Sequence, residues 1–333
     1  MPVTGFISME ASFQWHTEDR MRVFAIINGY TGALCLRELV DQGHEVVGVV
    51  TSPLARPSSA PDETVIGVAT KHLLPLYMPT NEVVGEPAPE FVGLMRKAKP
   101  DLLVSMHYAA IFKPTLLEIP PLGGVNVHPS KLPEGRGMTP SFWYLYLGRG
   151  TAWTSLHYLD SGIDSGDVIA HASVPITHDD TGATVSRKLS EAAWMTFREH
   201  LPAVMAGNAP RHKQDLSKGS YLRSGFNWGL IEWSREAKAI RGHVRCFTNT
   251  GSPAHTFVGE IKLTVNDAQV ARPEDCCAAK ENAVPGEVLA ITGKGPLIQA
   301  GAGQVILTDF ALEDAKAGDL MALSGGSAPV VLG

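Results

Sequence analysis

Short apolar runs alternate with amphipathic segments of about ten residues from Arg22 onward. Apart from Arg22 and Thr51 at their ends, residues 22–27 and 46–51 are apolar and rich in β-branched side chains, as in buried strands. Between them, residues 33–42 carry leucine and valine at near-helical spacing, and Gly43 ends the pattern. Strands that alternate with helices of this length form right-handed βαβ units, whose parallel sheet is covered on both faces. The pattern therefore predicts a doubly wound, mostly parallel α/β domain.

The alternation continues along the chain and then gives way to a different pattern. We expect further helices over 64–73, 89–98 and 182–205, and further strands over 74–78, 102–106, 123–128 and within 154–176. Past residue 208 the chain is polar, a helix is expected over 232–244, and residues 255–310 hold short apolar runs between glycines. Short strands at this spacing predict a small β-barrel-like (OB-like) domain.

These patterns give a two-domain plan. A length of 333 residues fits two domains better than one. Residues 1–20 are expected to be a flexible N-terminal extension, because the first strand begins only at Arg22. The α/β domain is expected over 21–208, a linker over 209–230 and the β-rich C-terminal domain over 231–333.

Composition narrows the class of protein. The chain has no uncharged apolar stretch of about 18 residues, and its first twenty residues carry Glu10, Glu18 and Asp19 instead of a basic and then apolar leader, so neither a membrane span nor export is expected. The four cysteines form neither a CxxC pair nor a disulfide framework, which indicates a reducing, cytoplasmic compartment. A net charge of −6 argues against nucleic acid as an obligatory partner.

Familiar cofactor motifs do not fit. The turn from Asn28 to Gly32 is glycine-rich, but it lacks the third glycine of a dinucleotide fingerprint, and the second strand ends without an acidic residue. A tight turn is the better interpretation. His44-Glu45 lacks the second histidine of a zinc helix, and the sequence has neither a P-loop nor a nucleophile elbow.

The strongest chemical signal is the segment 124–133, which contains Asn126 and His128. The two residues are two apart on an expected strand, so their side chains face the same side, close to the carboxyl end of the strand. Ligands of open α/β sheets bind at that edge. A carboxamide and an imidazole delivered there together suit an oxyanion stabiliser and a proton carrier.

A second signal is the acidic loop 159–167, in which three acids, among them Asp160 and Asp164, and two glycines interrupt an apolar β region. Asp164 is a candidate to orient or tune His128. Each motif also has a structural interpretation: Asn126 can bond backbone amides, and the two aspartates can cap turns.

Together, the motifs Asn-x-His-x-Ser-x-Leu-Pro and Asp-x-Gly-x-Asp-x-Gly resemble those of the formyltetrahydrofolate-dependent formyltransferase family. The family includes methionyl-tRNA formyltransferases and sugar N-formyltransferases. The likeness extends from about residue 99 to residue 169 and includes the loop 108–114. The resemblance is weaker in the second half of the chain. There, residues 231–235 resemble the interdomain segment of the tRNA-type members, and residues 284–288 resemble their C-terminal barrel.

The resemblance implies a catalytic role for residues 21–208, with Asn126, His128 and Asp164 as the catalytic trio. It also implies that 10-formyltetrahydrofolate is the formyl donor and that no metal is needed. The folate-binding positions that it implies are Tyr108, Ser130, Lys131, Leu132, Pro133 and Ile163. The chain departs from the family pattern twice: a hydrophobic residue is usual at Lys131, and an aromatic one near Gly135.

Formyl transfer to an amine suits these residue types, although sequence leaves the role of His128 open. Protonated His128 can stabilise an oxyanion together with Asn126, or neutral His128, paired with Asp164, can accept the proton of the amine. The expected acceptor is a small amine or hydroxylamine, such as a nucleotide-linked amino sugar or an amino-acid-derived metabolite. Methionyl-tRNA is the alternative acceptor; a folate hydrolase and a non-catalytic folate-binding module also remain open.

Charge is the basis for that order of acceptors. Residues 226–333 hold 9 basic and 12 acidic residues, an unfavourable balance for a tRNA backbone. Residues 182–224 hold 7 basic and 3 acidic residues, which can meet a diphosphate or a tRNA arm, or can form a solvated helix face. The sequence predicts no oligomeric state.

Overall fold

The computed structural model describes residues 20–52, 63–79, 89–108, 111–138, 140–222, 229–248, 252–275, 282–312 and 332. Apart from Arg20, the predicted N-terminal extension lies outside these residues. The chain divides into two compact units, the first made of residues 1–126, 158–162 and 198–209, and the second of residues 127–157, 163–197 and 210–333. The domain boundaries expected from the sequence stay a prediction.

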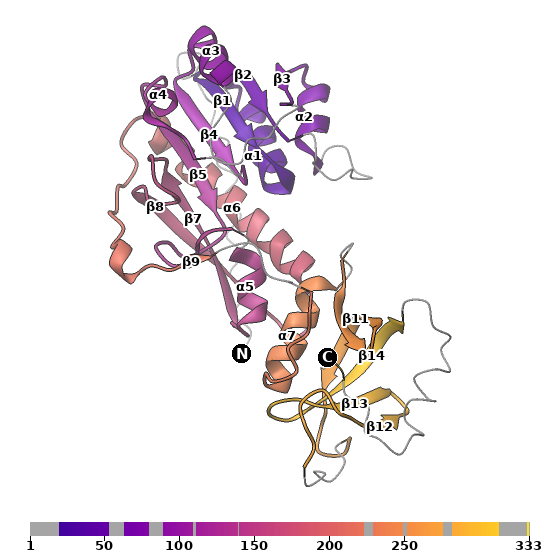
Figure 1. Cartoon of the computed structure of the whole chain (residues 1–333). Helices are drawn as coiled ribbons and strands as arrows, with labels where there is room; N and C mark the ends of the chain where they lie inside the picture. The colour runs from indigo at the N-terminus through magenta and orange to yellow at the C-terminus, as the bar shows by residue number, and fades with distance from the viewer. Residues whose placement is uncertain are drawn as a thin grey trace, which may run out of the picture. The chain divides into compact units, whose positions relative to one another are not determined.

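A seven-stranded sheet has the order β3-β2-β1-β4-β5-β7-β8 (Figure 1). Its strands are β1 (Arg22–Ile27), β2 (Glu45–Val50), β3 (Leu76–Tyr77), β4 (Leu102–Met106), β5 (Gly124–His128), β7 (Thr151–Tyr158) and β8 (Val168–Pro175). β1 pairs in parallel with β2 and with β4, and β2 pairs in parallel with β3, whereas β7 and β8 are antiparallel. The prediction of a mostly parallel α/β sheet is confirmed.

Helices pack on both faces of the first strands. They are α1 (Gly29–Asp41), α2 (Val65–Lys71), α3 (Pro89–Ala98) and α4 (Pro114–Leu117). Phe24 and Ile26 of β1 belong to a buried cluster that includes Met95 of α3 and Leu116 of α4. Ile27 points the other way and packs against Gly32 of α1. Because successive side chains of a strand alternate between faces, burial on both sides explains the continuous apolar run.

The second unit contains α5 (Pro140–Tyr146), β7, β8 and most of α6 (Gly182–Met205). It also contains a five-stranded antiparallel sheet of order β10-β11-β14-β13-β12. These strands are β10 (Ala254–Val258), β11 (Ile261–Val270), β12 (Val288–Thr292), β13 (Gly295–Gln299) and β14 (Gln304–Leu312). The prediction of a β-rich C-terminal part is confirmed.

The helix expected over 232–244 begins later and is α7 (Ala237–Phe247). Glu236 is extended, and the Ala237 amide donates to the Ala302 carbonyl at 2.8 Å, so this bond outside the helix delays the first helical turn. Ile240 and Val244 of α7 then pack into the core of the five-stranded sheet.

Residues 210–222, within the expected linker, contain the short helix η3 (Leu216–Lys218) and the strand β9 (Tyr221–Leu222), which pairs with β6 (Arg136–Gly137). Within the described ranges, no helix is long and apolar enough to cross a membrane.

Candidate active site

The loop that follows β5 turns back on the last residue of that strand, His128. Asn126 is half-buried on β5, and His128 is 6% exposed. The Ser130 amide donates to the His128 carbonyl at 2.8 Å, and the Ser130 hydroxyl donates to the Glu134 carbonyl at 2.8 Å. These bonds bring the Gly135 carbonyl to 2.9 Å from His128 Nε2. A carbonyl only accepts, so Nε2 carries the hydrogen.

Asp164 lies on the other side of the His128 ring. Its Oδ2 is 3.5 Å from His128 Nδ1 and accepts the Gly137 amide at 2.9 Å. Gly137 has φ +95°, a left-handed conformation that favours glycine. Asp164 itself has φ +49°, which is uncommon for a residue with a side chain. The structure thus brings two of the three predicted catalytic residues together in the second unit.

A second histidine, His157, approaches the same carboxylate and was missed from the sequence. It lies on β7, is 1% exposed, and its Nε2 is 3.7 Å from Asp164 Oδ1. The available signal was a histidine within an expected strand, just before the acidic loop. Asp164 is therefore flanked by two imidazoles and one backbone amide.

The four loop residues predicted to bind folate differ in their surroundings. Ser130 and Leu132 are buried, whereas Lys131 is exposed, with Nζ 4.3 Å from the centre of the Trp153 ring. The Pro133 carbonyl accepts the Ser220 amide at 3.3 Å. Ser130 and Leu132 therefore shape the loop from inside, and Lys131 lies over an aromatic ring instead of in a hydrophobic position.

The other two predicted folate residues are both half-buried. Ile163 directly precedes Asp164, and Tyr108 packs against the buried cluster that contains Phe24. Tyr108 and Asn126 belong to the first unit, and the remaining predicted site residues belong to the second. Residues 109 and 110 of the loop after Tyr108 lie outside the described part of the chain.

Ser155 of β7 is hydrogen-bonded to the backbone of the loop that follows His128. Its hydroxyl donates to the Ser130 carbonyl at 2.5 Å and accepts the Leu132 amide at 3.2 Å. Because the Ser155 hydroxyl has only one hydrogen, which the Ser130 carbonyl accepts, the hydroxyl oxygen accepts a hydrogen bond from His171 Nδ1 at 2.8 Å. Burial lowers the pKa of His171, and the charges of Lys131 and His212 lower it further.

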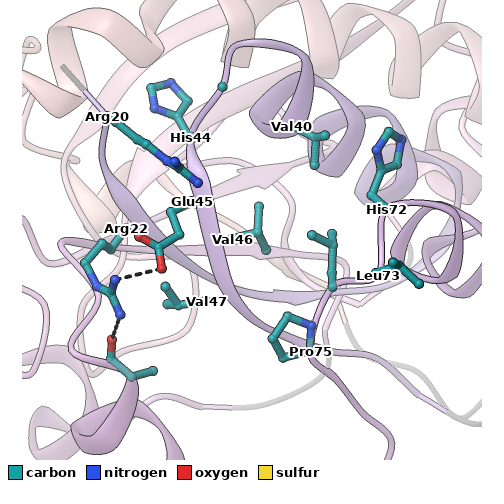
Figure 2. A pocket seen from close by; sticks show the side chains of 13 residues that line it. Arg20, Arg22, Val40, His44, Glu45, Val46, Val47, His72, Leu73 and Pro75 are labelled. Carbon is teal, nitrogen blue, oxygen red and sulfur yellow. Dashed lines mark hydrogen bonds and ion pairs between the residues drawn. The ribbon is translucent and has the colours of Figure 1, made fainter. Parts of the chain in front are cut away.

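A cavity of about 670 Å³ lies elsewhere, at the amino ends of β1 and β2 (Figure 2). Arg22 on its wall is held by Glu45 at 2.7 Å and by the Ala98 carbonyl at 2.7 Å. None of the predicted site residues lines this cavity. Among the described residues, no group of three or more His, Cys, Asp or Glu could hold a metal ion.

Comparisons with known proteins match both parts of the chain. Residues 21–201 match the family model described as formyl transferase, and residues 227–324 match that of the formyl transferase C-terminal domain. Methionyl-tRNA formyltransferase of Geobacter sulfurreducens is 31% identical over 287 residues, covering 84% of this chain and 86% of the relative. That of Citrifermentans bemidjiense is 32% identical over 295 residues, covering 86% and 88%.

Solved structures share the fold at low identity. An N-formyltransferase from Helicobacter canadensis, in complex with folinic acid and dTDP-3-aminofucose, has a TM-score of 0.64 at 14% identity and covers 86% of this chain and 98% of its own. HypX from Aquifex aeolicus, in complex with tetrahydrofolic acid, has a TM-score of 0.58 at 17% identity and covers 92% and 48%.

Proposed function

The chain belongs to the formyl transferase family, and from that premise we propose that it transfers the formyl group of 10-formyltetrahydrofolate to methionyl-tRNA. The observation that carries the proposal is the extent of the match. Relatives named methionyl-tRNA formyltransferase align over 84% to 86% of this chain, a span so long that it must extend into the residues matched by the C-terminal domain model. This reverses the order of acceptors expected from charge.

The residues of the candidate site suit the demands of the reaction. Formyl transfer to an amine builds negative charge on the formyl oxygen as the new C–N bond forms. The bond from the formyl carbon to N10 of the folate then breaks, and the proton that the attacking nitrogen loses is balanced by the one that N10 takes up. The amide of Asn126 and the imidazole of His128 are donors for that charge. We propose that Tyr108, Ile163 and the loop 130–133 hold the folate, which supplies the formyl group. Arg136 Nε is buried without a partner among the described residues, so a donor is available beside this loop for a polar ligand.

The hydrogen bonds of His128 support the oxyanion role. Its Nε2 donates to the Gly135 carbonyl, and its Nδ1 faces the Asp164 carboxylate at 3.5 Å. A ring with acceptors at both nitrogens is satisfied in the imidazolium form, which donates from both. On substrate binding, the Nε2 hydrogen would exchange the Gly135 carbonyl for the formyl oxygen, since catalytic hydrogen bonds often form only in the complex.

A small amine is the second candidate acceptor, and the arginines around α7 favour it. Arg235 donates to the Tyr146 carbonyl at 2.8 Å, Arg241 to the His178 carbonyl at 3.1 Å, and Arg245 to the Asp180 carbonyl at 2.6 Å. These guanidiniums hold protein segments together. They therefore add little to an interaction with a tRNA backbone, which needs cations directed at phosphates.

The deciding experiment compares acceptors in the presence of 10-formyltetrahydrofolate. Purified protein is incubated with charged initiator tRNA, nucleotide amino sugars, hydroxyornithine and simple amines, and formylated products are detected by mass. Formylation of methionyl-tRNA at micromolar concentration supports the proposal. Formylation of a small amine alone promotes the second candidate. Formate release without any amine identifies a hydrolase, and folate binding without turnover identifies a binding module.

Salt dependence gives an independent test of the tRNA acceptor. A protein that contacts six to ten phosphates loses roughly 10³- to 10⁵-fold in affinity over a fourfold rise in salt. A KM for methionyl-tRNA that rises steeply with salt supports the proposal, whereas a flat response contradicts a broad tRNA footprint.

A further inference from the structure

Residues 210–222, which we name the strap, bind both loops of the candidate site. The strap runs beside β8, where His212 and Val168 exchange two backbone hydrogen bonds of 2.9 Å, and continues to β9 (Figure 1). At its far end, Ser220 contacts the loop after His128. The Ser220 hydroxyl accepts the Gly135 amide at 2.8 Å, and the Ser220 carbonyl accepts the Arg136 amide at 3.1 Å.

Gln214 of the strap holds the acidic loop. Its Nε2 donates to the Asp164 carbonyl at 2.9 Å and to the Gly166 carbonyl at 2.7 Å. Two carbonyl acceptors require the amide nitrogen at this position, which fixes the orientation of the side-chain amide. Oε1 is buried without a partner in the described part of the chain, so the amide is held through its nitrogen.

The carbonyl that Gln214 holds belongs to a residue with an unfavourable backbone. Asp164 has φ +49°, and such conformations persist where the surroundings hold them. The same residue directs its carboxylate to His128 Nδ1 and to the Gly137 amide. A rotation of its backbone would move the carboxylate away from both.

We propose that Gln214 is a positioning residue for formyl transfer: it fixes the left-handed backbone of Asp164 and thereby keeps the carboxylate on His128. This inference rests on the proposed roles of His128 and Asp164. Gln214 acts through the loop, because both hydrogens of its amide are used by protein carbonyls.

The central variant is Gln214→Met, which keeps the length of the side chain and removes both donors. The expected result is a loss of about 10- to 100-fold in kcat, the size seen when a group that orients a reacting side chain is removed, with an unchanged KM for the folate. Gln214→Glu should lose more at neutral pH, because its carboxylate would face two carbonyl oxygens. Leu216→Ala, an exposed position on the same strap, is the matched control and should retain wild-type kcat.

Two further measurements separate positioning from general support of the fold. The first is the NMR titration of the His128 imidazole, which needs no acceptor: Gln214→Met should move it in the same direction as Asp164→Asn. The second is a double-variant cycle, in which Gln214→Met should cost little once Asp164 is asparagine, because the two residues act on the same contact.

The outcomes are distinct. Wild-type kcat and His128 titration in Gln214→Met, or full additivity in the cycle, would overturn the proposal while leaving the role of Asp164 intact. If Asp164→Asn itself changes neither kcat nor the titration, the assignment of Asp164 fails and the Gln214 proposal fails with it. Should Gln214→Met not fold, as judged by circular dichroism, Gln214→Ala takes its place in the same measurements.

Discussion

Gly242 of α7 gives a sharp test of how α7 packs on α5. It is buried, and a Cβ built on it would lie 2.5 Å from the carbonyl oxygen of Leu145, in the last turn of α5. Leu145 and Cys246 of α7 belong to one buried cluster that also contains Val185 of α6. Gly242→Ala therefore has to separate two backbones that are tied together by the surrounding core.

The expected loss of stability follows from two opposing effects. The Leu145 oxygen would have to retreat by about 0.9 Å, from 2.5 Å to the 3.4 Å at which ordinary contacts begin. Overpacking of this kind costs about 1–3 kcal/mol. The higher helix propensity of alanine offsets about 1 kcal/mol of that cost. Gly242→Ala should therefore lower the free energy of unfolding by up to about 2 kcal/mol.

Gly93 of α3 supplies the matched control. It is exposed in a helix, and no atom lies within 4 Å of a Cβ built on it, so Gly93→Ala should raise stability by about 0.5–1 kcal/mol. Because helix propensity is common to both variants, their difference isolates the steric cost. Urea denaturation of wild type and both variants measures it. Equal stability of the two variants would refute the close packing of α7 on α5.

The remaining predictions concern the site and one buried carboxylate. Steady-state assays should give a loss in kcat of about 10²- to 10⁴-fold for His128→Ala, with little change in folate affinity, and of about 10²- to 10³-fold for Asn126→Ala; near-wild-type rates in either would remove the mechanism. Asp164→Asn should move the pH–rate profile, because the imidazole loses a charge partner at 3.5 Å; an unchanged profile would reduce Asp164 to a turn residue. Burial alone would raise the pKa of Asp180, but hydrogen bonds from a lysine, two threonines and the backbone lower it well below its ordinary value. Its stabilising effect is therefore complete above the unfolded pKa of about 4 and is lost at lower pH, so the gap in unfolding free energy between wild type and Asp180→Asn should shrink in acid urea titrations.

The sheet, and the placement of Asn126 and His128 on one of its strands, could be predicted because both depend on patterns within short stretches of sequence. A strand buried on both faces must be continuously apolar, as β1 is after Arg22, and a helix that packs on it must repeat apolar residues every three or four positions. The strand that carries Asn126 and His128 was found for the same reason: within one strand, two residues in alternate positions share a face whatever the rest of the chain does.

The contacts around Asp164 could not be predicted, because they join segments far apart in the sequence. Gln214 is 50 residues from Asp164, and Ser220 is 85 residues from Gly135. Their positions depend on the pairing of β9 with β6, two strands of two residues each, which are too short to show any periodicity. The composition of residues 209–230 indicated a polar linker, and composition carries no information about which backbone groups a polar side chain meets.

The charge counts could not rank the two acceptors either, because they too ignore contacts between segments that are far apart in the sequence. The basic surplus of residues 182–224 was counted within that segment, but five of the six basic residues that the structure describes there form ion pairs, three of them with acids outside it. Those three are Lys188 with Asp180, Arg198 with Glu38, and Arg211 with Asp167. The field that a tRNA phosphate meets is therefore weaker than the count suggests. Exposed ion pairs are nevertheless worth little, so a phosphate can displace Asp167 from the exposed Arg211 more easily than it can displace the buried Asp180 from Lys188. What decides between the two acceptors is thus the number of basic side chains that can be released to phosphate, and not the net charge of either half of the chain.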